Sequence, residues 1–174
     1  MACFYFDSTA QKEQSAATVL GALLKQVVDS FREIPKEITD AFRRHKELIG
    51  GRELLLPEIV KMLGSLSSTR RTFLCLDALD ECAVPDRAKV LLSLKEIIKM
   101  SRTTRVFLTG RPYIGNEVEK YLPEGTALVS INSQTSDIIQ YIHTRLAEDT
   151  NPGEMDEGLE AEIVKKIPET ISEM

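Results

Sequence analysis

The sequence lacks the features that direct a chain to a membrane, to secretion or to nucleic acid. Its longest apolar runs are only a few residues, too short to span a bilayer. The N-terminal stretch MACFYFDSTAQKEQ has neither the charged start nor the long apolar segment of a signal peptide. The 22 basic and 27 acidic residues give a net charge of −5 without any basic block. We therefore expect no membrane partner and no nucleic-acid partner.

Cysteine is also scarce. The three cysteines, Cys3, Cys75 and Cys82, are an odd number and have no metal-ligand spacing. Two of them lie in apolar runs, where cysteine behaves as a small hydrophobic residue. This usage indicates a reducing compartment, and we expect a cytoplasmic protein.

A phosphate-binding loop is missing as well. The pattern G-x-x-x-x-G-K-[ST] does not occur, because none of the nine glycines is followed by lysine. The pair Gly50-Gly51 precedes Arg52 and has neither the spacing nor the hydroxyl residue of such a loop. The backbone amides and the lysine that hold β- and γ-phosphates in nucleotide-hydrolysing enzymes are thus absent from this sequence.

The sequence does contain a regular alternation of short apolar runs and amphipathic stretches. Its 174 residues, 43% hydrophobic and 28% charged, are sufficient for a globular domain with a core. The short runs predict strands and the stretches with helical spacing predict helices. The predicted strands lie at 3–6, 72–77, 106–109 and 127–131, and the predicted helices at 15–31, 35–49, from 57, 86–100, 136–147 and from 159. This order indicates an α/β fold with a mostly parallel sheet covered by helices on both faces.

Acidic residues follow one of these strands directly, in the stretch RTFLCLDALDEC at 71–82. The apolar run ends at Asp77, and Asp80 and Glu81 come immediately after it. Parallel sheets place ligand sites at the carboxyl ends of their strands. Arg111, after the run 106–109, lies 34 residues beyond Asp77, a separation that accommodates one strand–helix–strand crossover of ~30 residues. We therefore expect Asp77 and Arg111 to face one crevice.

These residue types fit the chemistry of a magnesium-bound nucleotide. Asp77 would offer Mg²⁺ a hard oxygen ligand, and Asp80 and Glu81 would orient or deprotonate an attacking water. Arg111 would stabilise charge on the γ-phosphate. A structural explanation remains open: Asp80, Glu81 and Asp86 could cap the following helix, and Thr109-Gly-Arg-Pro112 could be a turn.

A family resemblance adds to this interpretation. Phe73-Leu-Cys-Leu-Asp77-Ala-Leu-Asp-Glu-Cys82 resembles the Walker B segment of NACHT domains, which are STAND-class signal-transduction ATPases, and it is closest to the fungal NACHT and nephrocystin-like N-terminal types. Thr109-Gly-Arg-Pro112 resembles their sensor 1, with Gly110 in place of serine. Residues 3–28, 127–142 and 162–174 resemble the family's other strands and helices, so that the resemblance covers nearly the whole chain.

The resemblance implies a role for each matching residue. Asp77 would hold Mg²⁺, Asp80 and Glu81 would activate water, and Thr109 and Arg111 would contact ATP, with Arg111 reading its γ-phosphate. In the family the Walker A loop lies just upstream of the part resembling residues 3–6. We therefore expect an incomplete P-loop NTPase-like three-layer sandwich, with a partial NTPase core at 1–148, a linker at 149–158 and the start of a following helical segment at 159–174.

Three functions remain open. The first is a partial NACHT NTPase module that forms self-oligomers, or assembles with other NACHT-protein segments, in self/non-self or immune-like signalling. The second is a non-catalytic interaction or scaffold module that does not bind nucleotide. The third is a different Mg²⁺-dependent phosphotransfer enzyme. We expect no ATP turnover by this chain, and weak or absent nucleotide binding, because the loop that grips the phosphates is missing.

Overall fold

The computed structural model describes residues 1–47, 54–122, 125–131, 134–148 and 156–172. The chain divides into two compact units, Met1–Leu128 and Val129–Met174. The first unit holds a parallel sheet with its helices, and the second holds a pair of helices. No helix in the described ranges is long and apolar enough to cross a membrane.

Three parallel strands form the sheet of the first unit, in the order β1-β2-β3. They are β1 (Ala2–Tyr5), β2 (Thr72–Asp77) and β3 (Thr104–Leu108). Ala2 pairs with Leu74 in the register of β1 and β2, and Leu76 pairs with Leu108 in that of β2 and β3. Parallel neighbours need crossover connections, and here helices provide them.

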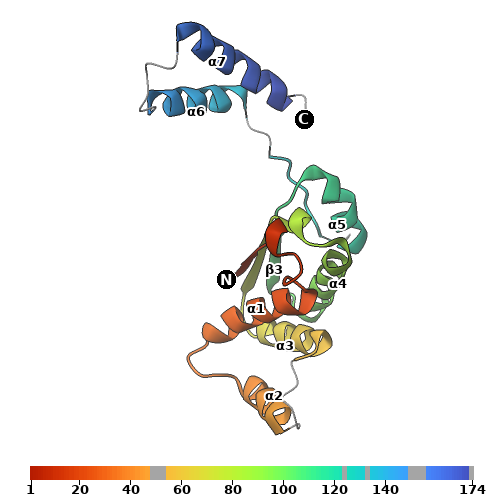
Figure 1. Cartoon of the computed structure of the whole chain (residues 1–174). Helices are drawn as coiled ribbons and strands as arrows, with labels where there is room; N and C mark the ends of the chain where they lie inside the picture. The colour runs from red at the N-terminus through yellow and green to blue at the C-terminus, as the bar shows by residue number, and fades with distance from the viewer. Residues whose placement is uncertain (48–53, 123–124, 132–133, 149–155, 173–174) are drawn as a thin grey trace. The chain divides into compact units, whose positions relative to one another are not determined.

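The helices α1 (Ala16–Asp29), α3 (Leu56–Ser68) and α4 (Val84–Met100) pack on one another, and α1 and α4 also pack on the sheet (Figure 1). Their starts follow local sequence signals, because Ser15 caps α1 and accepts from the Thr18 amide, while Pro57 and Pro85 occupy first-turn positions. Each helix buries one apolar stripe in the core that the three helices share with the sheet. The fully buried side chains are Val19, Leu20, Leu23, Leu63, Leu74, Leu76, Leu79, Cys82, Val90, Leu91, Leu94 and Ile97.

The opposite face of the sheet carries apolar side chains that remain partly exposed. Side chains alternate between faces along a strand, so that Leu74 and Leu76 enter the core while Phe73 and Cys75 point away from it. Phe107, 57% exposed, lies on this second face, and its ring centroid is 6.2 Å from that of Phe73. We call the set Cys3, Tyr5, Phe73, Cys75 and Phe107 the open face of the sheet.

The remaining elements of the first unit are shorter or peripheral. Helix α2 (Lys36–Glu47) buries Ile38 and Ala41. Three 3₁₀ turns follow the strands, η1 (Ser8–Ala10), η2 (Leu79–Glu81) and η3 (Pro112–Ile114). Helix α5 (Gly115–Tyr121) follows η3 and packs on α4. The sequence did not predict α5, because only one of its seven residues, Val118, is buried.

The second unit consists of α6 (Thr135–Ala147) packed on α7 (Glu157–Ser172). Both helices were predicted, and α7 begins two residues before the predicted start at 159. Most of the predicted linker, at 149–155, lies outside the described residues, as does Gly50-Gly51.

The α/β class with a parallel sheet flanked by helices is confirmed, and it is consistent with a P-loop-like sandwich. The expected cover of helices on both faces is not found among the described residues of the first unit, because Tyr5 and Phe107 of the open face are exposed. The strand predicted at 127–131 is wrong, because these residues form no strand. Leu128, Val129 and Ile131 are exposed, the last by 92%. Their apolar, β-branched pattern favours a strand, but the sheet of the described residues consists of β1, β2 and β3 and does not include this segment.

Candidate functional site

Asp77 and Thr109 meet where β2 and β3 end. Because the two strands are neighbours, the chain continues from both at the same edge of the sheet, and the Thr109 amide donates to Leu76 O at 3.0 Å. The Thr109 hydroxyl donates to Asp77 Oδ1 and accepts from the Ala78 amide at 3.0 Å. Thr109 therefore fixes the orientation of the Asp77 carboxylate, which stays exposed.

A left-handed residue turns the chain immediately after Asp77. Ala78 has φ 54° and ψ 45°, a conformation that non-glycine residues adopt rarely. The turn allows the Leu79 amide to donate to Thr109 O at 2.9 Å and buries the Leu79 side chain completely. As a result, the chain turns back toward β3, and Asp80 lies beside the loop that carries Arg111.

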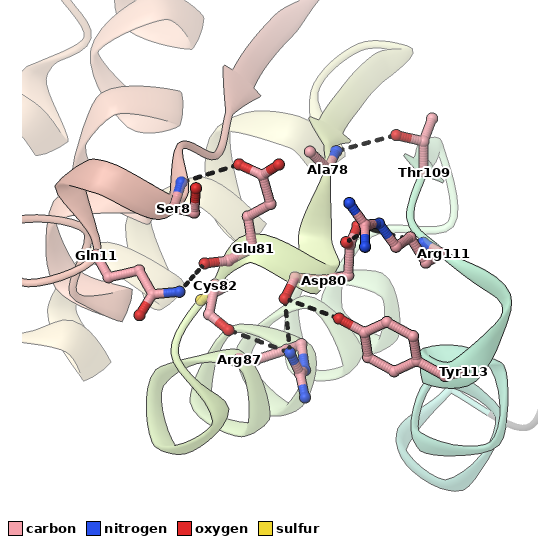
Figure 2. Close-up of polar contacts among 10 residues, drawn as sticks. All are labelled: Ser8, Gln11, Ala78, Asp80, Glu81, Cys82, Arg87, Thr109, Arg111 and Tyr113. Carbon is pink, nitrogen blue, oxygen red and sulfur yellow. Dashed lines mark hydrogen bonds and ion pairs between the residues drawn. The ribbon is translucent and has the colours of Figure 1, made fainter.

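Asp80 and Arg111 form a direct contact (Figure 2). Arg111 Nε lies 3.4 Å from Asp80 Oδ2, and the Arg111 amide donates to Asp80 Oδ1 at 3.2 Å. The Asp80 side chain is only 7% exposed, whereas that of Arg111 is 74% exposed. A Cβ at Gly110 would lie 2.5 Å from Ile114 Cδ1 and 3.3 Å from Asp80 Oδ1, so that glycine leaves room for this contact.

Glu81 is directed to a different element. Its Oε2 accepts from the Ser8 amide at 2.9 Å, and its carbonyl oxygen accepts from Gln11 Nε2 at 2.7 Å. Figure 2 shows the Glu81 side chain extending toward Ser8, while Asp80 extends toward Arg111. The two acids of this turn therefore tie the end of β2 to opposite neighbours, the β1–α1 connection and the loop after β3.

The helix-cap explanation does not hold for Asp80 and Glu81. The residue that precedes α4 as its N-cap is Ala83, which makes no side-chain cap. Of the three acids, only Asp86 lies in the first turn of α4, where it accepts from the Ala16 amide at 3.4 Å and pairs with Lys89 at 3.3 Å.

Three residues at this site were missed by the sequence interpretation. Arg87 donates from Nη1 to the carbonyl oxygens of Asp80 and Cys82, at 3.2 and 3.1 Å, and pairs through Nε with Glu117 at 2.8 Å. The Tyr113 hydroxyl lies 3.4 Å from Asp80 O. Arg87 could have been found, because it occupies the apolar stripe of α4 with Leu91 and Leu94, where a charge is unusual.

Cys82 ends the acidic stretch as a buried thiol. Burial, followed by the nearby Asp86 carboxylate, raises the pKa of Cys82 to about 11; Arg87 opposes this increase and Glu117 adds to it. At neutral pH the buried thiol keeps its proton, which disfavours attack by its sulfur and is typical of a packing residue.

The donors at this edge suit a hard cation bound together with phosphate. Asp77 offers an exposed carboxylate, and the hydroxyl of Thr109 adjoins it. The described part of the chain contains no group of three or more His, Cys, Asp or Glu side chains that could hold a metal alone. One carboxylate with water and phosphate oxygens is a common ligand set of Mg²⁺, so these residues fit a metal–nucleotide complex better than a free ion.

Comparison with known proteins identifies a family. The family model described as nephrocystin 3, N-terminal, matches residues 1–111, a range that contains every candidate site residue from Asp77 to Arg111. No curated protein matches the chain, and no solved structure does. Since the matched range covers more than half of the sequence, the chain belongs to the nephrocystin 3 N-terminal family.

Proposed function

We propose that this chain is part of a NACHT-type, nucleotide-dependent switch that recognises Mg²⁺-ATP at the carboxyl edge of its sheet. The observation that carries the proposal is the meeting of four side chains from neighbouring strand ends, with Asp77 bonded to Thr109 and Asp80 paired with Arg111. An acid that suits Mg²⁺ and an exposed guanidinium that suits phosphate thus occupy one edge.

Each residue has a distinct part in this proposal. Asp77 would hold Mg²⁺, and Thr109 keeps its carboxylate in place. The exposed guanidinium of Arg111 would bind the γ-phosphate. Its contact with Asp80 would then break, because the phosphate and the Asp80 carboxylate compete for the same N–H donors. Asp80 and Glu81 would then polarise the hydrolytic water, a role that requires their present bonds to Arg111 and Ser8 to loosen.

The absence of a phosphate-gripping loop limits what this chain does alone. Without backbone amides and a lysine around the β- and γ-phosphates, we expect millimolar or weaker binding of Mg²⁺-ATP and no turnover. Self-association, or assembly with other NACHT-protein segments in a cytosolic signalling complex, is the function we assign to the module.

The test is a titration with Mg²⁺-ATP followed by NMR of the backbone amides. We expect shifts at Asp77, Thr109 and Arg111 in the wild-type protein, and their loss in Asp77→Ala, because that variant has no carboxylate for the metal. The matched control is Asp137→Ala, an exposed acid of α6, which should bind as the wild type does. Shifts that persist unchanged in Asp77→Ala, or that are absent at about 10 mM ligand, would contradict nucleotide recognition at this edge.

A non-catalytic interaction module is the second candidate. The observation that favours it is the open face, on which Tyr5 and Phe107 are exposed although both are large and apolar. A protein of this kind would show no Mg²⁺-ATP shifts in the titration above. Wild-type binding tighter than about 1 mM would exclude it.

A further inference from the structure

One positive charge is buried beneath the acidic turn, which we define as residues 80–82. The Arg87 side chain is 8% exposed and projects from the first turns of α4. Burying a guanidinium is costly unless its N–H groups find acceptors and its charge is balanced. The acceptors of the Arg87 N–H groups therefore indicate which parts of the chain this buried side chain holds together.

Arg87 reaches three acceptors from two different segments. Its Nη1 donates to Asp80 O and Cys82 O, the two carbonyl groups on either side of Glu81, while its Nε pairs with Glu117 of α5 at 2.8 Å (Figure 2 shows the two carbonyl bonds). The planar guanidinium holds these donors in a fixed arrangement, which lysine does not. One side chain thus connects the acidic turn to the helix that follows the Arg111 loop.

A second connection parallels the first. The Tyr113 hydroxyl, from the turn η3 between Arg111 and α5, lies 3.4 Å from Asp80 O. Asp80 is therefore held on its carbonyl side by Arg87 and Tyr113 and on its carboxylate side by Arg111. The contact between Asp80 and Arg111 therefore requires that the acidic turn and the segment from Arg111 to α5 stay close together.

We propose that Arg87 is a positioning residue, which holds the acidic turn against α5 so that Asp80 faces Arg111 and Glu81 faces Ser8. Its significance for nucleotide chemistry rests on the function proposed above, but the positioning itself does not. Arg87 acts through the backbone of the turn and does not contact the metal or the phosphate.

Hydrogen exchange of single backbone amides tests this role. The Arg111 amide donates to the Asp80 carboxylate and the Ser8 amide to that of Glu81, so both amides report on the turn. The Leu74 amide, in the central strand, reports on opening of the whole sheet. In Arg87→Met we expect exchange at Arg111 and Ser8 to accelerate about tenfold or more relative to Leu74, because bonds to a charged group are lost.

A matched control is available in Arg105. Its Nη1 also donates to two carbonyl oxygens, of Arg102 and Thr104, each at 2.9 Å, but at the opposite end of β3. Arg105→Met should leave the Arg111 and Ser8 rates unchanged. Arg87→Lys keeps the charge and reaches fewer acceptors, so it should give an intermediate acceleration in a folded protein.

Three results would overturn the proposal. In the first, Arg111, Ser8 and Leu74 accelerate equally in the Arg87 variants, as expected of a residue that only stabilises the fold. In the second, the rates do not change. In the third, both Arg87 variants unfold, which would make Arg87 a core residue without a local role. Failure of the Mg²⁺-ATP titration alone would remove the nucleotide function and leave the exchange result standing.

Discussion

At the scale of single residues, the site is organised by charges that are hidden from solvent. Asp80 and Arg87 are both largely buried, and each has its charge balanced, Asp80 by Arg111 and Arg87 by Glu117. A buried ion whose partner is removed is costly, so each pair is sensitive to substitution of either member. Asp77, by contrast, is exposed and bonded to a neutral hydroxyl, which leaves its charge available to a cation.

Cys82 gives a prediction at this scale. Because it is buried and its pKa is raised to about 11, we expect iodoacetamide at pH 7.5 to modify the half-buried Cys3 and to spare Cys82 until the protein unfolds. Mass spectrometry of peptides after timed labelling measures this difference. Labelling of Cys82 at the rate of Cys3 in the folded protein would show that the thiol is accessible.

The same thiol affects stability at alkaline pH. An unfolded cysteine has a pKa of about 8.5, so the unfolded chain loses this proton first. The contribution of the protonated Cys82 thiol to the free energy of unfolding is full below about pH 8.5. It declines as pH rises toward about 11, with a slope of up to about 1.4 kcal/mol per pH unit. Burial and the neighbouring Cys3 also raise the pKa of Cys75, so Cys75 contributes to the same loss of stability. Urea unfolding at several pH values therefore compares Cys82→Ala with the wild type. The free energy of unfolding should fall less steeply with pH in the variant.

At the scale of elements, α4 holds the sheet and the acidic turn together. Its apolar stripe contains Val90, Leu91, Leu94 and Ile97, all fully buried, and the same side of the helix carries Arg87. One helix thus supplies both the core beneath β2 and β3 and the support for the residues that follow β2.

The stripe leads to a prediction for stability. Leu94→Ala should lower the free energy of unfolding by about 2–5 kcal/mol, because it leaves a cavity at a fully buried position. Leu92→Ala, at an exposed position on the same helix, should change it by less than about 0.5 kcal/mol. Urea unfolding followed by circular dichroism measures both, and equal effects would contradict the assigned orientation of α4.

The accuracy of the sequence predictions also varied from element to element. Strand β2 occupies 72–77 as predicted, because four apolar residues, 73–76, run directly into the charged Asp77. Helices α1 and α4 begin within two residues of their predicted starts, where Ser15 and Pro85 supply local signals. The segment 127–131 was assigned incorrectly, since strand formation depends on a distant partner that local pattern does not reveal.

The site was predictable to the extent that it depends on topology. The 34 residues between Asp77 and Arg111 leave room for one crossover between neighbouring strands; β2 and β3 are neighbours, and the structure brings Asp77 to Thr109 and Asp80 to Arg111. The residues that hold the site residues in position, Ser8 and Glu117, were not predictable from topology. Ser8 reaches Glu81 across 73 residues of sequence, and Glu117 reaches Arg87 across 30, so both contacts depend on how distant segments pack.

At the scale of the molecule, the sheet of the first unit has one face that the described helices of this unit do not cover. The open face presents Tyr5 and Phe107 to solvent, and β3 is the last strand of its sheet. Exposed apolar surface beside an unpaired strand edge favours association with another chain.

Self-association should therefore weaken when a charge is placed on the open face. We expect Phe107→Lys to raise the dissociation constant of any wild-type self-association tenfold or more, as measured by sedimentation velocity, because a lysine there must be desolvated for the contact to form. Leu92→Lys, an equally exposed position on α4, is the control and should behave as the wild type. Unchanged association in Phe107→Lys would show that the contact lies elsewhere.

The parallel pairing of β1 with β2 has a consequence for synthesis on the ribosome. Ala2 pairs with Leu74, 72 residues later in the chain. At about 5–20 residues translated per second, β1 emerges roughly 4–14 s before its neighbour exists. During that interval β2, the strand that pairs with β1, has not yet been made, so we expect chaperones that bind apolar segments to hold the stretch Cys-Phe-Tyr-Phe at 3–6 until translation reaches β2.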